Sequence, residues 1–421
     1  MLLRRLSAKT ALLGAVALAA AANGLAGCDD GESASSTGGG SGGGASLVTD
    51  APGLPVEGIS DEWAARFRSG DALFELPHRE ADGLGPLYIR QSCAACHTDD
   101  VRGPGFVEKM AVVEADGVTP AADQSELAYG HTVRPYTAAG ATTPIAPPDG
   151  SDVLVTRRVG PPVIGRGYIE AIRDDEIERV EAEQAQRTDA IHGRINRVTY
   201  VSQANSDATF FSFMPGQEGL IGRFGLKARQ PSLDDFTADA FQGDMGLTSP
   251  MRPDEPPNPD GLTDDAAPGL DIPIDDVNDI ADYMRLLAIP PRATPDPKAV
   301  ALFSQSKCDV CHVPSMRTRA DYPIAELADI DAAVYTDLLL HDLGDDLADG
   351  LAVEGVATSR DWRTAPLIGL RFNRTLMHDG RAKTIHEAVA AHGGEATESR
   401  DTYLGLSDED RALLDTFVDG L

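Results

Sequence analysis

Hydrophobic residues recur at helical spacing in several separate stretches of the chain. Apolar positions after Ser60, a residue type that caps helix N-termini, predict a helix early in the sequence. Helical spacing also predicts a helix over about residues 275–288, which the following proline pair ends. Nearer the C-terminus, Thr384 and Glu387 form a capping box, and a last helix is predicted to begin near Ser407.

Stretches without helical periodicity separate these helices. Residues 98–170 are rich in glycine, proline, threonine and valine, which is typical of loops and short strands. Residues 250–273 are rich in proline and glycine among acidic side chains and predict an extended surface loop. From Pro297 the helical pattern restarts as a compact module. We therefore expect a mainly α fold in two parts, the first of which is enlarged by loop and short-strand insertions.

The start of the chain has the layout of an export signal. Basic residues precede an apolar stretch over residues 10–22, which is too short to span a membrane comfortably. The sequence LAGC that ends at Cys28 looks like the lipobox of bacterial lipoproteins, in which the cysteine is acylated and the chain is cut before it. We expect residues 1–27 to be a lipoprotein signal peptide and residues 28–50 a lipidated Gly/Ser-rich tether. The alternative is an ordinary signal peptide in which Cys28 is incidental.

The other four cysteines form two copies of one motif. Residues 92–97 read SCAACH and residues 307–312 read KCDVCH, so no cysteine is left over for a disulfide framework. Closely spaced cysteines serve redox dithiols, zinc sites and c-type haem attachment. A redox dithiol needs no histidine after the second cysteine, and a zinc site would not require that histidine in both copies. Thioether attachment of haem does require it, because the imidazole must reach the iron from the same turn.

The two motifs therefore predict two covalently bound c-type haems. The residues expected to hold them, by thioether bonds and by proximal ligation of iron, are Cys93, Cys96 and His97 for the first haem and Cys308, Cys311 and His312 for the second. On this basis we expect residues 51–296 to form an N-terminal haem domain with insertions. Residues 297–421 are expected to form a C-terminal cytochrome c-like haem domain.

The charge balance limits the partners of this chain. Its 421 residues include 67 acidic and 36 basic side chains, for a formal net charge of -31. Nucleic acid is not expected to bind, because phosphate contacts need the opposite sign of charge. A strongly acidic surface would steer a small, basic electron-donor protein toward this one, although the acidity is equally compatible with a merely solvated surface. Attachment to a membrane is expected through the lipid alone, on the periplasmic face of a bacterial membrane.

Several stretches form long motifs in a fixed order: DGLGPLYIRQSCAACH (82–97), RVGPPVIGRGYIEAI (158–172), GRFGLKARQPSL (222–233), DAFQGDMGLTSP (239–250), YTDLLLHDLGDDLADG (335–350), DWRTAPLIGL (361–370) and MHDGRAKTIHEAVAAHGGEA (377–396). Together they resemble the bacterial di-haem oxidoreductases, relatives of the di-haem cytochrome c peroxidases, over most of residues 60–421. The resemblance implies an enzyme that takes electrons through the C-terminal haem. Peroxide or another small oxidant would then be reduced at the N-terminal haem.

The resemblance also implies a second iron ligand for the C-terminal haem. In the related peroxidases this ligand follows the histidine of a His-Asp-Gly motif at a fixed spacing, which leads here from His378 to His392. We therefore expect His392 to be the distal ligand and to give bis-histidine, low-spin iron suited to electron transfer. The alternatives are that His392 only caps the end of a helix, or that His378, His341 or Met377 binds the iron instead.

For the N-terminal haem the resemblance implies the catalytic site, because peroxide chemistry needs an open or displaceable iron position. Related peroxidases place a glutamate beside the peroxide, and Asp234 stands at the position that we match to it, with a shorter side chain. Gln230 is a second candidate, as a neutral donor. The competing interpretation is that both belong to an ordinary helix start. His131 is a further candidate for a displaceable ligand.

Two departures from the pattern of the relatives limit what is expected. The sequence TDAIHGRINRV retains only the second part of a stretch that resembles a calcium loop in relatives, so calcium is not predicted. Trp362 is the remaining candidate for an aromatic relay between the haems, with core packing as the alternative. Two other functions stay open: a tethered electron carrier with both irons six-coordinate, and thiol oxidation, which would have to occur at a haem.

Overall fold

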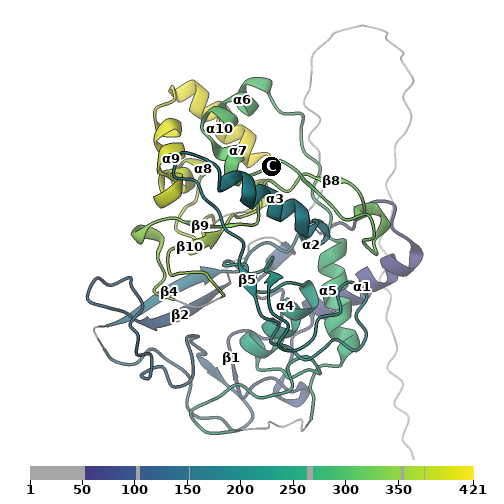
Figure 1. Cartoon of the computed structure of the whole chain (residues 1–421). Helices are drawn as coiled ribbons and strands as arrows, with labels where there is room; N and C mark the ends of the chain where they lie inside the picture. Colours follow the sequence, from purple (N-terminus) through teal and green to yellow (C-terminus); the bar gives the residue numbers. More distant parts are fainter. Residues whose placement is uncertain (1–52, 101–104, 151, 263–268, 352–354, 374) are drawn as a thin grey trace, which may run out of the picture. The chain divides into compact units, whose positions relative to one another are not determined.

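A computed structural model describes residues 53–100, 105–150, 152–262, 269–351, 355–373 and 375–421 (Figure 1). These residues belong to one compact unit. The predicted signal peptide and the predicted lipid site at Cys28 lie outside the described residues. In the part of the chain that is described, no helix combines the length and the apolar character needed to cross a membrane.

Ten α-helices occur among the described residues: α1 (Asp61–Glu75), α2 (Arg166–Ala171), α3 (Asp174–Gln184), α4 (Leu233–Ala240), α5 (Ile274–Leu286), α6 (Pro297–Gln305), α7 (Cys308–Cys311), α8 (Ile385–Ala390), α9 (Thr397–Leu404) and α10 (Asp408–Asp419). The predicted caps are confirmed at three of them. The hydroxyl of Ser60 accepts a hydrogen bond at the start of α1, Ser407 caps α10, and Thr384 forms the capping box of α8 with Glu387.

Helices α1 and α5 pack along one another in the N-terminal part (Figure 1). Gly70 of α1 allows this contact, because a Cβ atom there would lie only 2.1 Å from the carbonyl oxygen of Asp279 in α5. The apolar face predicted for α5, including Val277, Ile280 and Met284, is buried in the largest hydrophobic cluster. Helix α4 packs on the same helix. The core of this part is therefore built on α5.

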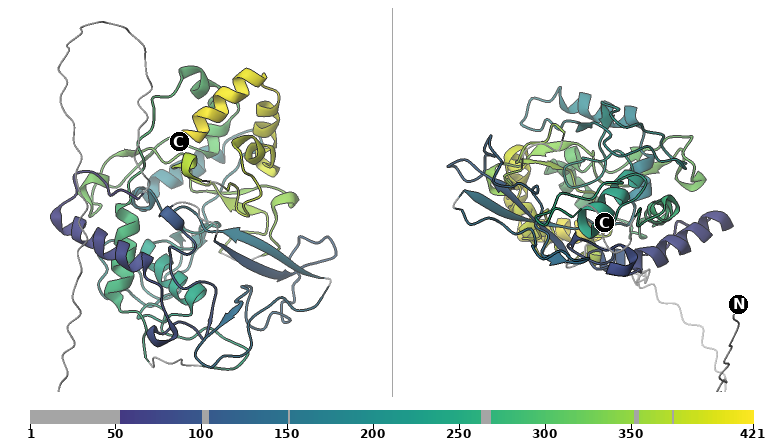
Figure 2. Two further views of the ribbon diagram at one scale, coloured as in Figure 1. Left: turned by 180° about the vertical axis from the view of Figure 1, so that it is seen from behind. Right: turned by 90° about the horizontal axis from the view of Figure 1, so that it is seen from below.

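The strands pair as five two-stranded antiparallel sheets: β1 (Leu87–Tyr88) with β3 (Tyr136–Thr137), β2 (Phe106–Val112) with β4 (Val153–Val159), β5 (Arg197–Val198) with β6 (Leu220–Ile221), β7 (Met316–Arg317) with β8 (Asp331–Ala332), and β9 (Leu340–Asp342) with β10 (Asp361–Arg363). Strands β2 and β4 pair over seven residues and lie side by side in Figures 1 and 2. They confirm the short strands predicted within residues 98–170.

The mainly α expectation needs a partial correction, because the described residues combine helices with these small sheets. The sheets are short and separate. Their strands form because they pair with segments distant in sequence, so the local pattern of apolar residues did not predict most of them. The largest hydrophobic cluster also draws on both sides of residue 297, from Phe74 to Ile368. Another cluster is confined to the C-terminal part and joins α6, α8, α9 and α10, with Tyr403 fully buried. The predicted boundary between residues 296 and 297 stays a prediction.

A buried cation, Arg285 of α5, connects three helices. Its guanidinium group donates to Glu170 of α2 at 2.7 Å, to Asp282 of α5 at 2.8 Å, and to Asp234 of α4. All four side chains are almost fully buried. The hydroxyl of Tyr322 donates to Glu170 at 2.8 Å. Burying so many charges is costly, and only the complete set of contacts offsets that cost.

Replacing Arg285 by methionine should therefore lower the free energy of unfolding by about 3–5 kcal/mol, because it leaves buried carboxylates without their cation. Urea denaturation of the holoprotein would measure this loss. The matched control is Arg179→Met, which removes an exposed arginine that also contacts two carboxylates, Glu176 and Glu183. That control should cost at most about 1 kcal/mol. Equal losses in the two variants would contradict the importance of the buried set.

Candidate functional site

Both Cys-x-x-Cys-His motifs fold as one turn of chain. In the first, the backbone N–H of His97 donates to the carbonyl oxygen of Cys93 at 3.0 Å. In the second, helix α7 makes the same turn, and the N–H of His312 donates to the carbonyl oxygen of Cys308 at 2.9 Å. Each turn therefore presents two thiols and one imidazole together, as thioether attachment of a haem requires.

The first turn borders a cavity of about 80 Å³. Its walls come from the motif, from residues 161–166 and from helices α4 and α5, and they are mostly apolar. Two glycines let the chain pass close to the motif: a Cβ at Gly105 would lie 2.4 Å from the Cα of Cys96, and one at Gly160 would lie 2.9 Å from Cε1 of His97. The ring of Phe74 lies 6.1 Å from that of His97.

The second turn borders a larger cavity, of about 230 Å³, which His312 and His392 both line. His312 donates from Nδ1 to the carbonyl oxygen of Tyr335 at 3.2 Å, and His392 donates from Nδ1 to that of Ala388 at 2.7 Å. Because a carbonyl oxygen only accepts, Nδ1 of each ring carries the proton and Nε2 carries the lone pair. This is the arrangement in which a histidine can bind a metal through Nε2.

Burial keeps both of these rings neutral. It lowers the pKa of His312 to about 4, with a further contribution from the nearby His392. It also lowers the pKa of His392. Neutral imidazole is the form that binds metals, so both rings suit ligation of iron at neutral pH.

The four thiols are not suited to thiol chemistry as free groups. None of them forms a disulfide in the described chain. Burial raises the pKa of Cys93 and of Cys308 to about 12 and that of Cys96 to about 11. Because the thiolate is the reactive form, a redox dithiol would need the opposite shift. The buried thiols beside apolar cavities fit thioether bonds to haem better.

Asp234 and Gln230, the predicted catalytic residues, are both buried, but neither lines a described cavity. The carboxylate of Asp234 is held by Arg285 and by Asn205 at 3.1 Å. The carbonyl oxygen of Gln230 closes a turn by accepting from the N–H groups of Arg223 and Phe224. Their catalytic roles stay predictions, and this placement gives them no support.

Asp244 is a residue whose role the sequence did not reveal. It lines the first cavity from a π-helical turn, Phe241–Met245, that directly follows α4. Such turns are rare in proteins, and those that occur often lie at functional sites. Burial raises the pKa of the Asp244 carboxyl group, although the charge of Lys109 partly offsets this effect. The motif DAFQGDMGLTSP contains Asp244, but nothing in its spacing showed which of its two acidic residues reaches the cavity.

Three further candidates, His378, Met377 and His341, also line the second cavity. The ring of His378 stacks on Trp362, with centroids 3.6 Å apart, and burial lowers its pKa to about 4. Trp362 also donates from its indole to the carbonyl oxygen of Leu347 at 2.9 Å and lines the same cavity. His131, by contrast, is exposed and contacts the carbonyl oxygen of Met110.

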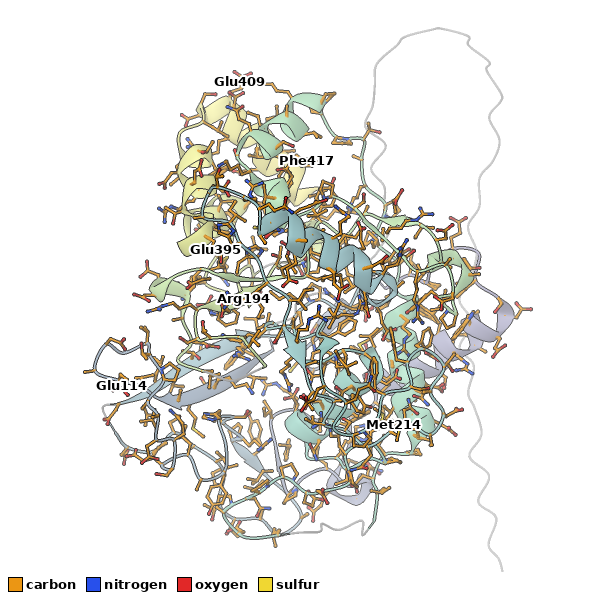
Figure 3. All side chains as sticks on the ribbon, in the orientation of Figure 1. Glu114, Arg194, Met214, Glu395, Glu409 and Phe417 are labelled. Atoms are coloured by element: carbon orange, nitrogen blue, oxygen red, sulfur yellow. The ribbon has the colours of Figure 1, made fainter. Side chains whose placement is uncertain are left out.

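His341 holds the segment after His392 in place. Its ring lies between Asp337, at 2.9 Å from Nε2, and Glu395, at 2.8 Å from Nδ1. Glu395 is labelled in Figure 3, between strand β9 and the C-terminal helices. Gly394 packs directly against β9, because a Cβ there would lie 2.1 Å from the carbonyl oxygen of Asp342. This ring is therefore engaged by two carboxylates.

The residues present fit two haems. Each cavity has a cysteine pair and a histidine on one turn, mostly apolar walls, and arginine side chains among its lining residues. The second cavity adds His392, which lies close enough to His312 to affect its pKa. The first cavity contains a single histidine among its described lining residues, together with the carboxyl group of Asp244.

Comparison with solved structures finds distant similarity. The diheme peroxidase BthA from Burkholderia thailandensis is 14% identical, with a TM-score of 0.39, covering 89% of this chain and 92% of that one. A MauG-like protein associated with microbial copper homeostasis is 14% identical, with a TM-score of 0.34 and coverage of 90% and 94%. Hydrazine synthase from Kuenenia stuttgartiensis is 11% identical, with a TM-score of 0.34 and coverage of 91% and 100%.

A search of curated protein sequences finds no match. The assignment therefore rests on a family model described as "Di-haem oxidoreductase, putative peroxidase", which matches residues 149–421. That region includes the second motif, α4 and the turn that carries Asp244. It confirms the resemblance inferred from the motifs. The chain belongs to the di-haem oxidoreductase family, which makes it a peroxidase-like oxidoreductase and implies two haems.

Proposed function

We propose that this protein is a lipid-anchored, di-haem c-type oxidoreductase that reduces hydrogen peroxide or another small oxidant at the His97 site. The observation that carries the proposal is the difference between the two cavities. Histidines His312 and His392 both line the second, whereas the first combines one histidine with the carboxyl group of Asp244. When bound, haem supplies one-electron chemistry and an iron that can bind small oxidants.

At the second site, the protein would hold the iron between two imidazoles. Nε2 of His312 and Nε2 of His392 are the available donor atoms, and the backbone carbonyl groups of Tyr335 and Ala388 fix the two rings. Six-coordinate iron cannot bind an oxidant but can pass electrons. The His312 site is therefore proposed as the entry point for electrons, and the His97 site as the place where the oxidant is reduced.

At the first site, the protein would supply a proton. Reduction of a peroxide to water consumes two protons with two electrons, so a group that delivers protons into the cavity assists the reaction. Asp244 is the described acidic side chain that lines this cavity. Because burial raises its pKa, its carboxyl oxygen keeps a proton to higher pH than an exposed aspartate would.

The electron donor is proposed to be a small basic protein outside the cytoplasm. The net charge of -31 would steer such a donor by long-range attraction. The lipid on Cys28 and the Gly/Ser-rich tether after it would keep the enzyme at the periplasmic face of a membrane, where the donor diffuses. Export also agrees with thioether attachment, because c-type haem is attached outside the cytoplasm.

The second candidate function is a tethered electron carrier. It is favoured by Met245 and Met284, which both line the first cavity. A thioether sulfur can be an axial ligand of haem iron, as in cytochromes c. If either methionine binds the iron permanently, both sites are six-coordinate and no oxidant can be reduced.

Covalent haem and lipid attachment can be measured together by intact mass spectrometry of the mature protein. We expect a mass that includes two haems and a lipid modification at Cys28. The Cys28→Ser variant should lose the lipid and leave the membrane fraction while keeping both haems, because the haem motifs do not depend on the anchor. A soluble wild type without lipid, or fewer than two haems that survive denaturation, would contradict the respective part of the proposal.

The His392→Leu variant should lose the low-spin ferric signal that we expect from the His312 site in the electron paramagnetic resonance spectrum of the wild type, and a high-spin signal should replace it. The reason is that Nε2 of His392 is proposed to occupy the sixth position at the His312 site. His131→Gln is the control, because His131 is exposed and lies outside both cavities. An unchanged spectrum in His392→Leu would show that another side chain is the ligand.

The Asp244→Asn variant should reduce hydrogen peroxide about a hundredfold more slowly or worse, with both haems attached, because the amide cannot deliver a proton. Turnover would be followed as peroxide consumption with a reduced chemical mediator as electron donor. Asp244→Glu, which restores a carboxyl group, should recover part of the rate. If Asp234→Asn abolishes turnover in a folded, haem-loaded protein and Asp244→Asn does not, the assignment of Asp244 is wrong.

A further inference from the structure

One short segment, residues 159–166, touches both haem sites. The backbone N–H of Val159, the last residue of β4, donates to the carbonyl oxygen of His378 beside the second cavity at 2.8 Å. The next residue, Gly160, packs on the other side against the ring of His97. Two adjacent residues therefore contact the surroundings of both sites, and the chain that follows them must run between the two cavities.

Four residues line both cavities: Pro161, Pro162, Arg166 and Arg363. We call Arg166 and Arg363 the shared arginine pair. Both are buried, with exposed fractions of 5% and 7%. They come from distant parts of the sequence, the N-terminal end of α2 and strand β10.

Backbone carbonyl groups orient both guanidinium groups. Nε of Arg166 donates to the carbonyl oxygen of Pro162 at 2.7 Å. Nε of Arg363 donates to the carbonyl oxygen of Gly225 at 3.0 Å. The backbone N–H of Arg363 donates to the carbonyl oxygen of Leu226 at 2.9 Å. Gly225 lines the first cavity and Leu226 the second, so Arg363 is anchored where the two cavities adjoin.

A planar guanidinium group binds carboxylates through two parallel hydrogen bonds. The rim of a haem carries two carboxylate side groups, and a haem attached at either motif would occupy the cavity that the motif borders, which both arginines line. We propose that the shared arginine pair binds carboxylate groups of both haems and thereby couples the two sites electrostatically. The proposal rests on the presence of two haems, which is part of the proposed function.

This coupling has a measurable consequence. Reduction adds an electron to a haem, and a fixed positive charge nearby favours the reduced state. An arginine that lies beside one haem raises the reduction potential of that haem alone. An arginine shared by two haems raises both potentials, so its removal should lower both together.

The test is a spectroelectrochemical titration of the haem-loaded wild type and of Arg166→Gln and Arg363→Gln. Each variant should lower the midpoint potentials of both haems, while Arg166→Lys and Arg363→Lys, which keep the charge, should recover much of the shift. Two control variants each remove a cation that lines one cavity only. Arg90→Gln, at the first cavity, should shift one haem, and Lys307→Gln, at the second, should shift the other.

Paired shifts in both glutamine variants, with single shifts in the controls, support the shared site. A shift of only one haem in each glutamine variant, or no shift with both haems attached, overturns it. If a glutamine variant does not retain both haems, the lysine variant at that position is measured instead. Midpoint potentials of both haems well below those of the wild type, despite the retained positive charge, would also overturn the proposal. A wild type that lacks two haems would instead contradict the proposed function.

Discussion

The buried contacts of Arg285 are the interaction on which the first site depends. This one cation joins α2, α4 and α5 through Glu170, Asp234 and Asp282. The same three helices provide much of the wall of the first cavity, including Arg166 from α2 and Met284 from α5. Because an incomplete set of buried charges would be costly, the three helices are held in one arrangement. That arrangement fixes the cavity beside His97.

The two sites are alike at the Cys-x-x-Cys-His turn and differ in the side chains that line the rest of each cavity. Both motifs make one turn with the same hydrogen bond from histidine to the first cysteine. His392, just after α8, lines the second cavity, and its ring is fixed by the carbonyl oxygen of Ala388. The first cavity receives Asp244 from a π-helical turn. This asymmetry is the basis of the proposal that electrons enter at the His312 site and that an oxidant is reduced at the His97 site.

Four residues line both cavities and therefore lie where the two sites adjoin. Pro161 and Pro162 stiffen the segment that separates the cavities, and the shared arginine pair brings charge to their junction. Trp362 lies at the edge of the second cavity in a stack with His378. Its burial and its indole hydrogen bond show that it packs in the core, as one of the two interpretations of this residue expected.

The sequence by itself determined the features that depend on neighbouring residues. The two haem motifs, the caps of α1, α8 and α10, and the apolar face of α5 need only contacts within a few positions, so pattern and spacing reveal them. Tertiary structure alone decided which acidic residue reaches the first cavity. Asp234, directly after GRFGLKARQPSL, is engaged by Arg285, which lies 51 residues further on, whereas Asp244, within DAFQGDMGLTSP, lines the cavity. Such choices depend on partners that are distant in sequence, and no local pattern records them.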